Sequence, residues 1–406
     1  MKHLPWIVMA LAVGFVPAPA AAQKPTPEKI LSSMDDDGDG RVSREEWLKP
    51  PPAFKRIDTN NDGFLTYKEM AARFGGGAKK NGSVKWIDVH VHPNGGRGII
   101  HNFPVAVKMA LDVMDDNNIS HMVLMPTPQI PDKLPTYPLE RFIEEARKFP
   151  DRFVVMGGGG TLNPMIHDES PDGHPGKDLK ERFAERAEAI MEMGAVGFGE
   201  LSLLHLSLVP GHAFEDVPGD HPLFLLLADI TAKHDVVIDV HFDPVVEDIE
   251  RPDWLSRDNP SEFKRNLDGF ERFLEHNRNA KISWAHAGSD QIGHWTTDLT
   301  RRMLKKHPNL YMSLRMTRGR SKKNHPLTPQ GIDPEWMSVF QEFPDRFFLG
   351  GDQMFSPPGS AGPAAEFAEF AVKIRRRSNW FLSYLPPKLA RMIGYENAMR
   401  VYKIKK

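Results

Sequence analysis

The stretch WIDVHVHP at residues 86–93 places two imidazoles one residue apart in a short apolar segment. In a β-strand, side chains two residues apart project from the same face, so we expect His90 and His92 to point together, with Asp88 behind them. Imidazole is the commonest metal ligand among protein side chains. A His-x-His pair alone is usually accidental, so its meaning depends on what else the chain places beside it.

Four more polar residues stand at the ends of short apolar segments. Glu200 ends AVGFGE, His241 ends VVIDVH, His286 ends KISWAH, and Asp352 follows RFFLGG. Imidazoles and carboxylates that converge in space form a typical ligand set for a divalent transition metal. The chain has 17 histidines and no cysteine, which favours these ligands over thiolates.

The elements that must position these residues form a regular series. Apolar segments lie at residues 84–89, 121–126, 152–157, 195–200, 236–241, 281–286, 309–314 and 346–351, and helix-like stretches between them include residues 139–149, 179–193, 222–234 and 266–277. Eight β-then-α units over about 320 residues predict an α/β fold, the (β/α)8 TIM-type barrel. A doubly wound open sheet is the alternative, but no G-x-G-x-x-G follows the first segment. In a barrel, all the polar strand ends lie at one rim.

Two acidic twelve-residue segments precede the barrel, at residues 35–46 and 58–69. Both have oxygen-bearing side chains at positions 1, 3 and 5, glycine at position 6 and glutamate at position 12, which is the spacing of a calcium loop. The predicted Ca²⁺ ligands are Asp35, Asp37, Asp39, the Arg41 carbonyl and Glu46 in the first loop, and Asp58, Asn60, Asp62, the Phe64 carbonyl and Glu69 in the second. Residues 25–74 resemble a small all-α EF-hand pair, with solvated acidic turns as the alternative. Val42 and Leu65 are expected to pair their backbones.

The first 22 residues have the features of an export signal. Lys2 and His3 precede an apolar segment from Leu4 to Val16, and three alanines end the stretch. This pattern predicts a cleaved signal peptide and a periplasmic or secreted protein, with a buried N-terminal helix as the alternative. The expected domains are therefore a signal peptide (1–22), an EF-hand pair (25–74), a flexible linker (75–83) and the barrel (84–406).

The composition limits the classes of partner. Charged residues make up 26% of the chain and the formal net charge is −2, so there is no basic excess of the kind that binds nucleic acid. No apolar run of the mature chain is long enough to span a bilayer. We expect a small-molecule substrate, no nucleic acid, and no membrane attachment after signal cleavage. The sequence leaves the oligomeric state open.

The polar set resembles that of the amidohydrolase superfamily of metal-dependent hydrolases, over residues 84–403. Three motifs, IDVHVHP, PDRFFLGGD and LARMIGYENAMRVY, are similar to the amidohydrolase 2 subgroup, which includes lactonases, other hydrolases and non-oxidative decarboxylases. The resemblance implies that His90, His92 and Asp352 hold one metal ion. It also implies that His241 joins them or helps His286 hold a second ion.

The same resemblance bears on the number of ions and on the chemistry. Glu200 stands where some members have a carboxylated lysine, which implies a glutamate bridging two ions in a TatD-like arrangement; in one-metal members this residue need not bind. One ion or two therefore stays open, with Zn²⁺ expected and Mn²⁺, Fe²⁺ or Ni²⁺ also suited to these ligands. Asp352 is expected to be the general base, and His286, where it is not a ligand, to stabilise the oxyanion.

Substrate recognition has a weaker signal. Arg315, in SLRMTRGR after the seventh segment, is the predicted substrate-binding residue for a carboxylate or phosphate, with a solvated basic loop as the alternative. Trp284 is expected on the same interior face as His286. The sequence thus predicts an exported metal-dependent hydrolase of a small ester, lactone or amide. The alternatives are a metal-dependent non-oxidative decarboxylase of a small organic acid and a calcium-dependent binding protein with an inactive barrel.

Overall fold

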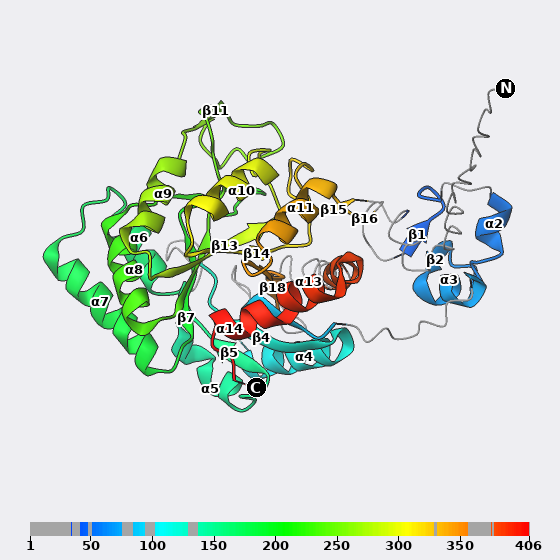
Figure 1. Ribbon diagram of the computed structural model, residues 1–406, viewed down its shortest axis with the longest axis horizontal. Helices are drawn as coiled ribbons and strands as arrows, with labels where there is room; N and C mark the ends of the chain where they lie inside the picture. The colour runs from blue at the N-terminus through cyan, green and yellow to red at the C-terminus, as the bar shows by residue number, and fades with distance from the viewer. Residues whose placement is uncertain are drawn as a thin grey trace, which may run out of the picture.

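The computed structural model describes residues 34, 41–47, 51–74, 84–93, 102–128, 137–328, 331–355, 375 and 377–405. The expected signal peptide (1–22), the expected linker (75–83) and three predicted ligands of the first calcium loop, Asp35, Asp37 and Asp39, lie outside the described residues. The described chain forms a large barrel with a small N-terminal module beside it (Figure 1). None of its helices is both long and apolar enough to cross a bilayer.

Eight parallel strands form the barrel wall. They are β3 (Trp86–His92), β4 (Ile119–Leu124), a third strand in two pieces, β5 (Phe153–Val155) and β6 (Gly157–Gly158), then β7 (Gly197–Ser202), β10 (Val237–His241), β13 (Lys281–Ala287), β14 (Leu310–Leu314) and β17 (Phe347–Leu349). Hydrogen-bonded neighbours follow the order β5-β4-β3-β17-β14-β13-β10-β7-β6. Only Met156 separates β5 from β6, so the third strand joins both ends of this path and closes the ring. The predicted barrel is confirmed.

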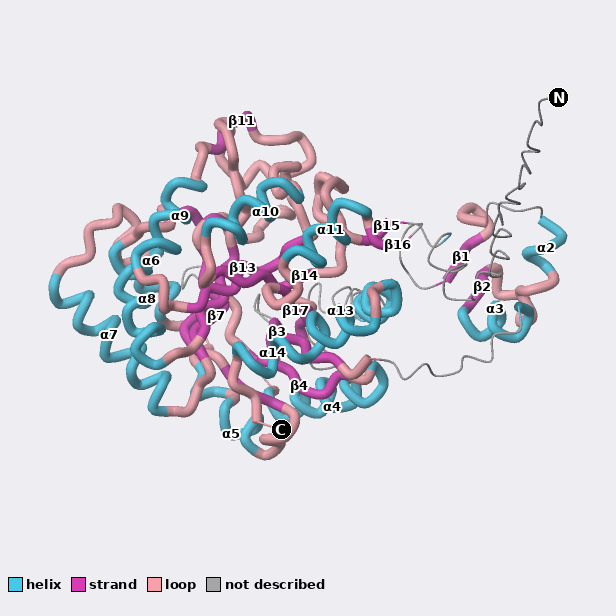
Figure 2. Tube along the Cα trace, viewed as in Figure 1, coloured by secondary structure: helices cyan, strands magenta, loops and turns pink. Residues whose placement is uncertain are grey.

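Helices cover the outside of this ring, as Figure 2 shows. They are α4 (Phe103–Asn117), η1 (Leu139–Arg141), α5 (Ile143–Arg147), α6 (Leu162–His167), α7 (Lys177–Glu192), α8 (Pro222–His234), α9 (Leu267–His276), α10 (Thr297–Lys306) and α11 (Pro334–Glu342). The helix expected over residues 139–149 is instead the short η1 followed by α5. Near the C-terminus, a helical stretch at residues 377–384 precedes α13 (Pro387–Arg391), η2 (Met392–Glu396) and α14 (Asn397–Val401).

Short hairpins lie within the loops between strands and helices. They are β8 (Leu204–His205) with β9 (Glu215–Asp216), β11 (Ile249–Glu250) with β12 (Glu262–Phe263), and β15 (Leu327–Thr328) with β16 (Gly331–Ile332). A further short strand, β18 (Gln353–Met354), follows β17 and pairs with β3. This pairing carries the residue before it, Asp352, to the strand that bears His90 and His92.

Apolar side chains fill the barrel in two layers. The larger cluster lies between the strands and the helices, where α7, for example, buries Leu179, Phe183, Ala187 and Ile190 at helical spacing. A second cluster joins Ile87, Val123, Met156, Val237, Tyr311 and Phe348 from strands around the ring to Tyr402 near the C-terminus. Side chains from so many strands meet inside the barrel, so its centre is packed and the polar strand ends remain for the rim.

The N-terminal module is built around a two-stranded bridge. Strand β1 (Arg41–Ser43) pairs antiparallel with β2 (Phe64–Thr66), and Val42 lies opposite Leu65 as predicted. The helices α2 (Pro51–Lys55) and α3 (Tyr67–Phe74) flank it. Trp380, from the helical stretch before α13, packs against the apolar core of this module. The module and the barrel domain therefore touch at Trp380.

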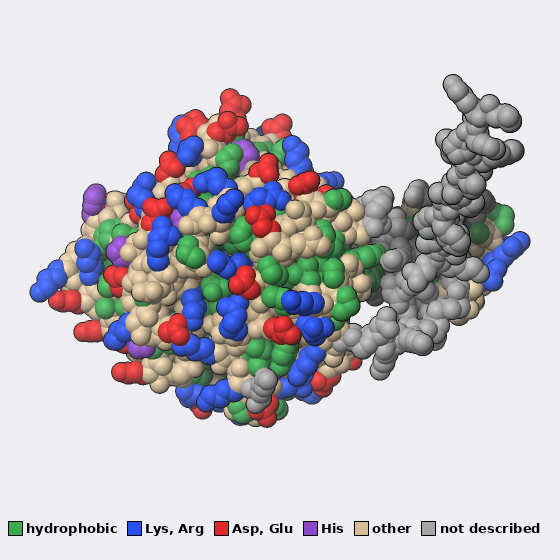
Figure 3. Space-filling view, viewed as in Figure 1, with side chains coloured by type: hydrophobic (Ala, Val, Ile, Leu, Met, Phe, Trp, Pro, Cys, Tyr) green, Lys and Arg blue, Asp and Glu red, His purple; other side chains and the backbone are tan. Residues whose placement is uncertain are grey.

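The surface matches the nearly neutral composition. On the face drawn in Figure 3, basic and acidic side chains are interspersed over the barrel. This face shows no large field of one sign that would attract a polyanion.

Candidate metal centre

Three of the predicted residues, His90, His92 and Glu200, bring one ligand atom each close together at the rim, and Asp352 lies beside the two imidazoles. The Nε2 atoms of His90 and His92 lie 3.2 Å apart. Oε2 of Glu200 lies 3.5 Å and 3.3 Å from these two atoms, and Oδ1 of Asp352 lies 3.9 Å and 3.3 Å from them. Tetrahedral ligands about 2.1 Å from a zinc ion are about 3.4 Å apart, so the atoms of His90, His92 and Glu200 can share one ion, with Asp352 beside them.

The other oxygen of Glu200 faces a second set of imidazoles. Its Oε1 lies 3.0 Å from Nδ1 of His241 and 3.0 Å from Nε2 of His286. Glu200 thus belongs to two sets, one with His90 and His92 and one with His241 and His286, and within each of them the candidate ligand atoms lie within 4.8 Å of one another. The arrangement suits two ions bridged by Glu200, and it equally suits one ion whose glutamate is held by two imidazoles.

The electrostatics of this group fit a cation. Burial alone lowers the pKa of the His90 imidazole, but Asp239 and Glu200 raise it well above its usual range. For His92, burial also lowers the pKa, and Asp352 and Glu200 outweigh it, so the pKa is raised. Buried imidazoles become this basic only where carboxylate charge is left unbalanced. The donor set therefore fits a divalent ion in both ligand type and charge.

A buried aspartate that the sequence reasoning missed orients His90. Oδ1 of Asp239 lies 3.0 Å from Nδ1 of His90, and both side chains are fully buried. The Ser283 hydroxyl donates to the other oxygen of Asp239 at 3.1 Å. On His92, Nδ1 lies 3.1 Å from the Met125 carbonyl. Protons held on these Nδ1 atoms leave each Nε2 lone pair for a metal. A signal was present, because Asp239 lies two residues before His241 on one strand.

A second buried network, also missed, ties the metal-bearing strand to the eighth. Oδ1 of Asp88 accepts hydrogen bonds from the backbone N–H groups of His90 at 3.2 Å and Gly351 at 2.7 Å. The Gln353 amide donates to Oδ2 of Asp88 at 2.5 Å and accepts from Nη1 of Arg375 at 2.6 Å. Burial raises the pKa of Asp88 to about 6. This network fixes the backbone on both sides of Asp352.

Two site residues have backbone conformations that non-glycine residues seldom adopt. His286 has φ of 72° and Asp352 has φ of 50°. Such strain is concentrated at functional sites, where the surrounding fold maintains it. At His286 the left-handed conformation coincides with a break in the strand alternation. Trp284 points outward, where it stacks on Trp295 with ring centroids 4.1 Å apart and packs against Phe270 of α9. The expectation that Trp284 shares the interior face of His286 is therefore wrong.

The predicted substrate residue lies at the site. Nη2 of Arg315 is 2.9 Å from Oδ2 of Asp352, and its side chain is 14% exposed, so it does not belong to a solvated loop. Burial alone raises the pKa of the Asp352 carboxyl, but Arg315 and His92 hold it well below its usual range. Asp352 is therefore ionised, with one oxygen toward the imidazoles and one toward the guanidinium.

Three residues border the second set of imidazoles. Oδ2 of Asp243 lies 3.2 Å from Nε2 of His241. The His205 ring lies 4.2 Å from the ring of His241 and 4.7 Å from the ring of His212, between centroids. These polar side chains extend the site toward the loop after β7.

The second calcium loop has the expected turn, with Gly63 at φ of 85°. The Glu69 carboxylate accepts from the backbone N–H groups of Thr59 and Thr66, each at 2.9 Å. Burial alone raises the pKa of Glu69, but hydrogen bonds from Thr66 and its neighbours lower it to about 2. Oδ1 of Asp58 is buried without a hydrogen-bond partner. An ionised glutamate and an orphaned carboxylate oxygen fit a Ca²⁺ ion.

In the first loop, the described residues include two of the predicted ligands. The Glu46 carboxylate accepts a hydrogen bond from the Ser43 backbone at 2.7 Å. Arg41 pairs with Thr66 in the two-stranded bridge, so the carbonyl predicted to face the ion lies beside the second loop.

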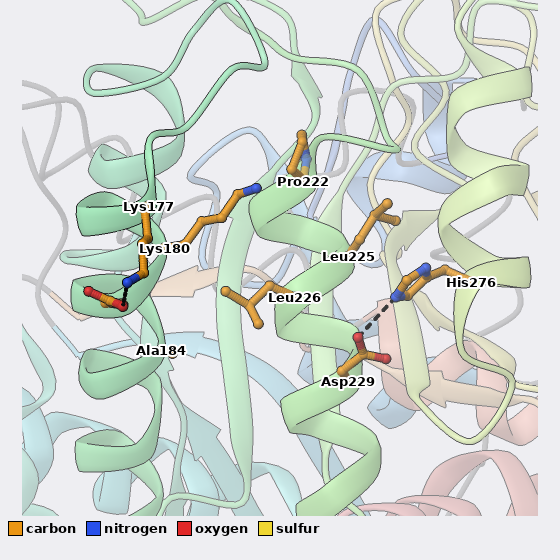
Figure 4. A pocket seen from close by; sticks show the side chains of 9 residues that line it. Lys177, Lys180, Ala184, Pro222, Leu225, Leu226, Asp229 and His276 are labelled. Carbon is orange, nitrogen blue, oxygen red and sulfur yellow. Dashed lines mark hydrogen bonds and ion pairs between the residues drawn. The ribbon is translucent and has the colours of Figure 1, made fainter.

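An open groove lies on the outside of the barrel, lined by Lys180, Ala184, Leu225, Leu226 and neighbouring residues of α7, α8 and α9 (Figure 4). None of the strand-end ligands lines it. The groove is therefore separate from the candidate metal centre.

Two family models match this chain. A family model described as an amidohydrolase matches residues 87–404, and one described as an EF hand matches residues 28–49 and 52–74. A transaldolase from Thermosynechococcus vestitus is 42% identical over 48 residues, so the chain spans only 12% of that relative's length and the match covers 12% of this chain.

Solved structures with similar barrels have low sequence identity to this chain. An uncharacterized TIM-barrel protein from Bordetella bronchiseptica is 14% identical, with a TM-score of 0.47, over 79% of this chain and 99% of that chain. Dihydroorotase from Saccharomyces cerevisiae is 14% identical, with a TM-score of 0.42, over 80% of this chain and 85% of that chain.

Proposed function

This chain belongs to the amidohydrolase family of metal-dependent hydrolases, and from that premise we propose that it cleaves a small ester, lactone or amide after export from the cytoplasm. The observation that carries the proposal is the convergence of three candidate ligand atoms, from His90, His92 and Glu200, with the Asp352 carboxylate beside the two imidazoles. These groups come from β3, β7 and the segment after β17, and all lie at the carboxyl ends of the barrel strands. This end of a TIM barrel carries the active site.

We propose that these four residues hold the first ion. Glu200, His241 and His286 hold a second ion when two are bound. A divalent ion in such a site lowers the pKa of bound water and polarises a substrate oxygen. Zn²⁺ is the proposed ion because it favours a tetrahedral set of nitrogen and oxygen ligands, and Mn²⁺, Fe²⁺ and Ni²⁺ are the other candidates.

The protein side chains supply positioning and proton transfer. Asp352 is ionised, so it accepts a proton from the attacking water and later returns it to the leaving group. Arg315 holds one oxygen of Asp352 and presents its guanidinium to a carboxylate or carbonyl oxygen of the substrate. His286, in one-ion form, is proposed to stabilise the oxyanion once its N–H turns from Glu200, 3.0 Å away, to the substrate oxygen.

The N-terminal segments have supporting roles in this proposal. Residues 1–22 direct export and are removed, so the enzyme acts in the periplasm or outside the cell. The EF-hand pair binds Ca²⁺, which is plentiful outside cells. The bound Ca²⁺ stabilises this N-terminal module, which contacts Trp380 of the barrel domain. The substrate is a small molecule, and neither nucleic acid nor a membrane is a partner.

A metal-dependent decarboxylase is the second candidate, because of Arg315. A guanidinium beside the metal ligands is well placed to hold a substrate carboxylate. In that reaction the C–C bond to the carboxylate breaks, CO₂ leaves, and a proton takes its place on carbon. Product analysis separates the two candidates, since only hydrolysis consumes water.

Replacement of the proposed base tests the function. With a panel of small esters, lactones and amides, Asp352→Asn is expected to lower turnover about 10³-fold while the folded spectrum remains. Asp345→Asn is the matched control, an exposed aspartate of the same PDRFFLGGD segment. Full activity in Asp352→Asn would contradict the assignment, and release of CO₂ by the wild type would favour the decarboxylase.

A further inference from the structure

A second imidazole–carboxylate group lies far from the rim, where α9 meets α10. Glu271 and Glu275 are one turn apart on α9, and His307 directly follows α10. Their candidate ligand atoms lie within 4.8 Å of one another. The strand β14 begins three residues after His307, so this group lies at the amino ends of the strands. That end of a TIM barrel serves stability rather than catalysis.

His307 is the unusual member of this group. Its side chain is fully buried, and neither ring nitrogen has a hydrogen-bond partner among the described residues. Its Nε2 lies 3.7 Å from Oε2 of Glu271. Buried polar atoms are nearly always satisfied, and an exception often marks a missing water or ion. The orphaned imidazole therefore faces the carboxylates as a metal ligand would.

A positive charge already occupies the space between the carboxylates. Nζ of Lys306 contacts Oε2 of Glu271 and lies 3.0 Å from Oε1 of Glu275. Arg302 holds the other oxygen of Glu271 at 2.5 Å. The Lys306 side chain is 47% exposed, so it can move into solvent at little cost, while Arg302 keeps Glu271 in place.

We propose that Glu271, Glu275 and His307 form a structural site for a divalent ion of the Zn²⁺ class, which replaces Lys306 between the two carboxylates. Two carboxylate oxygens and one imidazole nitrogen suit Zn²⁺, and water completes the coordination. The ion gives the orphaned His307 nitrogen a partner and fastens α9 to α10. The site is independent of the rim and of the reaction that takes place there.

Equilibrium dialysis of the full chain against low-micromolar Zn²⁺ tests the site. Wild type is expected to bind one more ion per chain than Glu275→Gln, whose exposed position makes misfolding no concern. The matched control, Glu185→Gln, alters an exposed glutamate of α7 and is expected to bind as much as wild type. Equal zinc content in wild type and Glu275→Gln would overturn the proposal, whatever the rim binds.

A lysine substitution tests the competition. Lys306→Met is expected to tighten zinc binding at this site about fivefold, because the ion no longer has to displace an ammonium group. Lys305→Met, which alters the exposed neighbouring lysine, is expected to leave the affinity unchanged. An unchanged affinity in Lys306→Met would show that the ion does not take the place of Lys306.

Discussion

The role of Asp239 can be tested without touching a metal ligand. In Asp239→Asn the side chain keeps its size and one acceptor oxygen near His90, but it loses its negative charge. Loss of a carboxylate partner of a metal-binding imidazole typically weakens metal binding about 10- to 100-fold. Asp239 and His90 are 3.0 Å apart and fully buried, so water cannot replace the lost charge. We therefore expect a loss near the upper limit, about 2.7 kcal/mol.

The assay is competition for Zn²⁺ with a chelator of known affinity. Both proteins carry Glu275→Gln, so that only the rim site is measured. Ser283→Ala is the graded control, because it removes only the hydroxyl that donates to Asp239, and a smaller loss is expected. If Asp239→Asn binds Zn²⁺ as tightly as its parent, the orientation of His90 does not depend on this carboxylate and the reasoning is refuted.

Two further predictions concern buried groups of the barrel, and a third concerns the N-terminal module. Gln353→Leu removes the amide that donates to Asp88 and accepts from Arg375, so both buried charged groups lose a hydrogen-bond partner. The free energy of unfolding measured by denaturant titration should therefore fall by about 3 kcal/mol. Glu215 is a buried residue of β9 whose carboxylate accepts a hydrogen bond from the Asn163 amide at 3.2 Å, and burial raises its pKa to about 7. Since an unfolded glutamate ionises near pH 4.5, the folded form retains the proton longer, and wild type should lose up to about 3 kcal/mol of stability between pH 5 and 8, relative to Glu215→Gln. Glu69→Gln, or removal of Ca²⁺ with EGTA, should lower the melting temperature of the N-terminal module and change the fluorescence of Trp380.

Each of these has a clear contrary result. Unchanged stability of Gln353→Leu would show that the buried network does not hold the strands together. Parallel pH profiles for wild type and Glu215→Gln would mean that this carboxyl ionises normally in the folded protein. A melting curve that is the same with and without EGTA would show that Ca²⁺ does not stabilise the N-terminal module.

The sequence predicts the barrel well because its signal is repeated eight times. Each apolar segment lies within a few residues of an observed strand. Because the parallel strands close into a ring, the polar residues at their carboxyl ends all lie at the same rim. His90 and His92 meet as expected because strand alternation holds up to the end of β3. The contact between Glu200 and the imidazoles of three other strands, β3, β10 and β13, follows from the barrel topology alone.

What the sequence does not predict depends on local breaks and on distant partners. The left-handed backbone at His286 breaks the alternation, so Trp284 faces the helices. Gln353 and Asp88 lie far apart in the chain, and no local pattern indicates that they form a hydrogen bond. The segment at 139–149 has a helical pattern, but the chain forms two short helices there, η1 and α5, and no contact among the described residues explains the break.

The metal-dependent mechanism is tested most simply by the transition-metal content of the rim site. In the Glu275→Gln background, the parent and a variant with both His90 and His92 replaced by asparagine are loaded with Zn²⁺, washed and analysed for metal, with circular dichroism to verify the fold. We expect one or two ions per chain in the parent and their loss in the double variant. Equal metal content in the two folded proteins, or none in the parent, would contradict a metal-dependent hydrolase site at this rim.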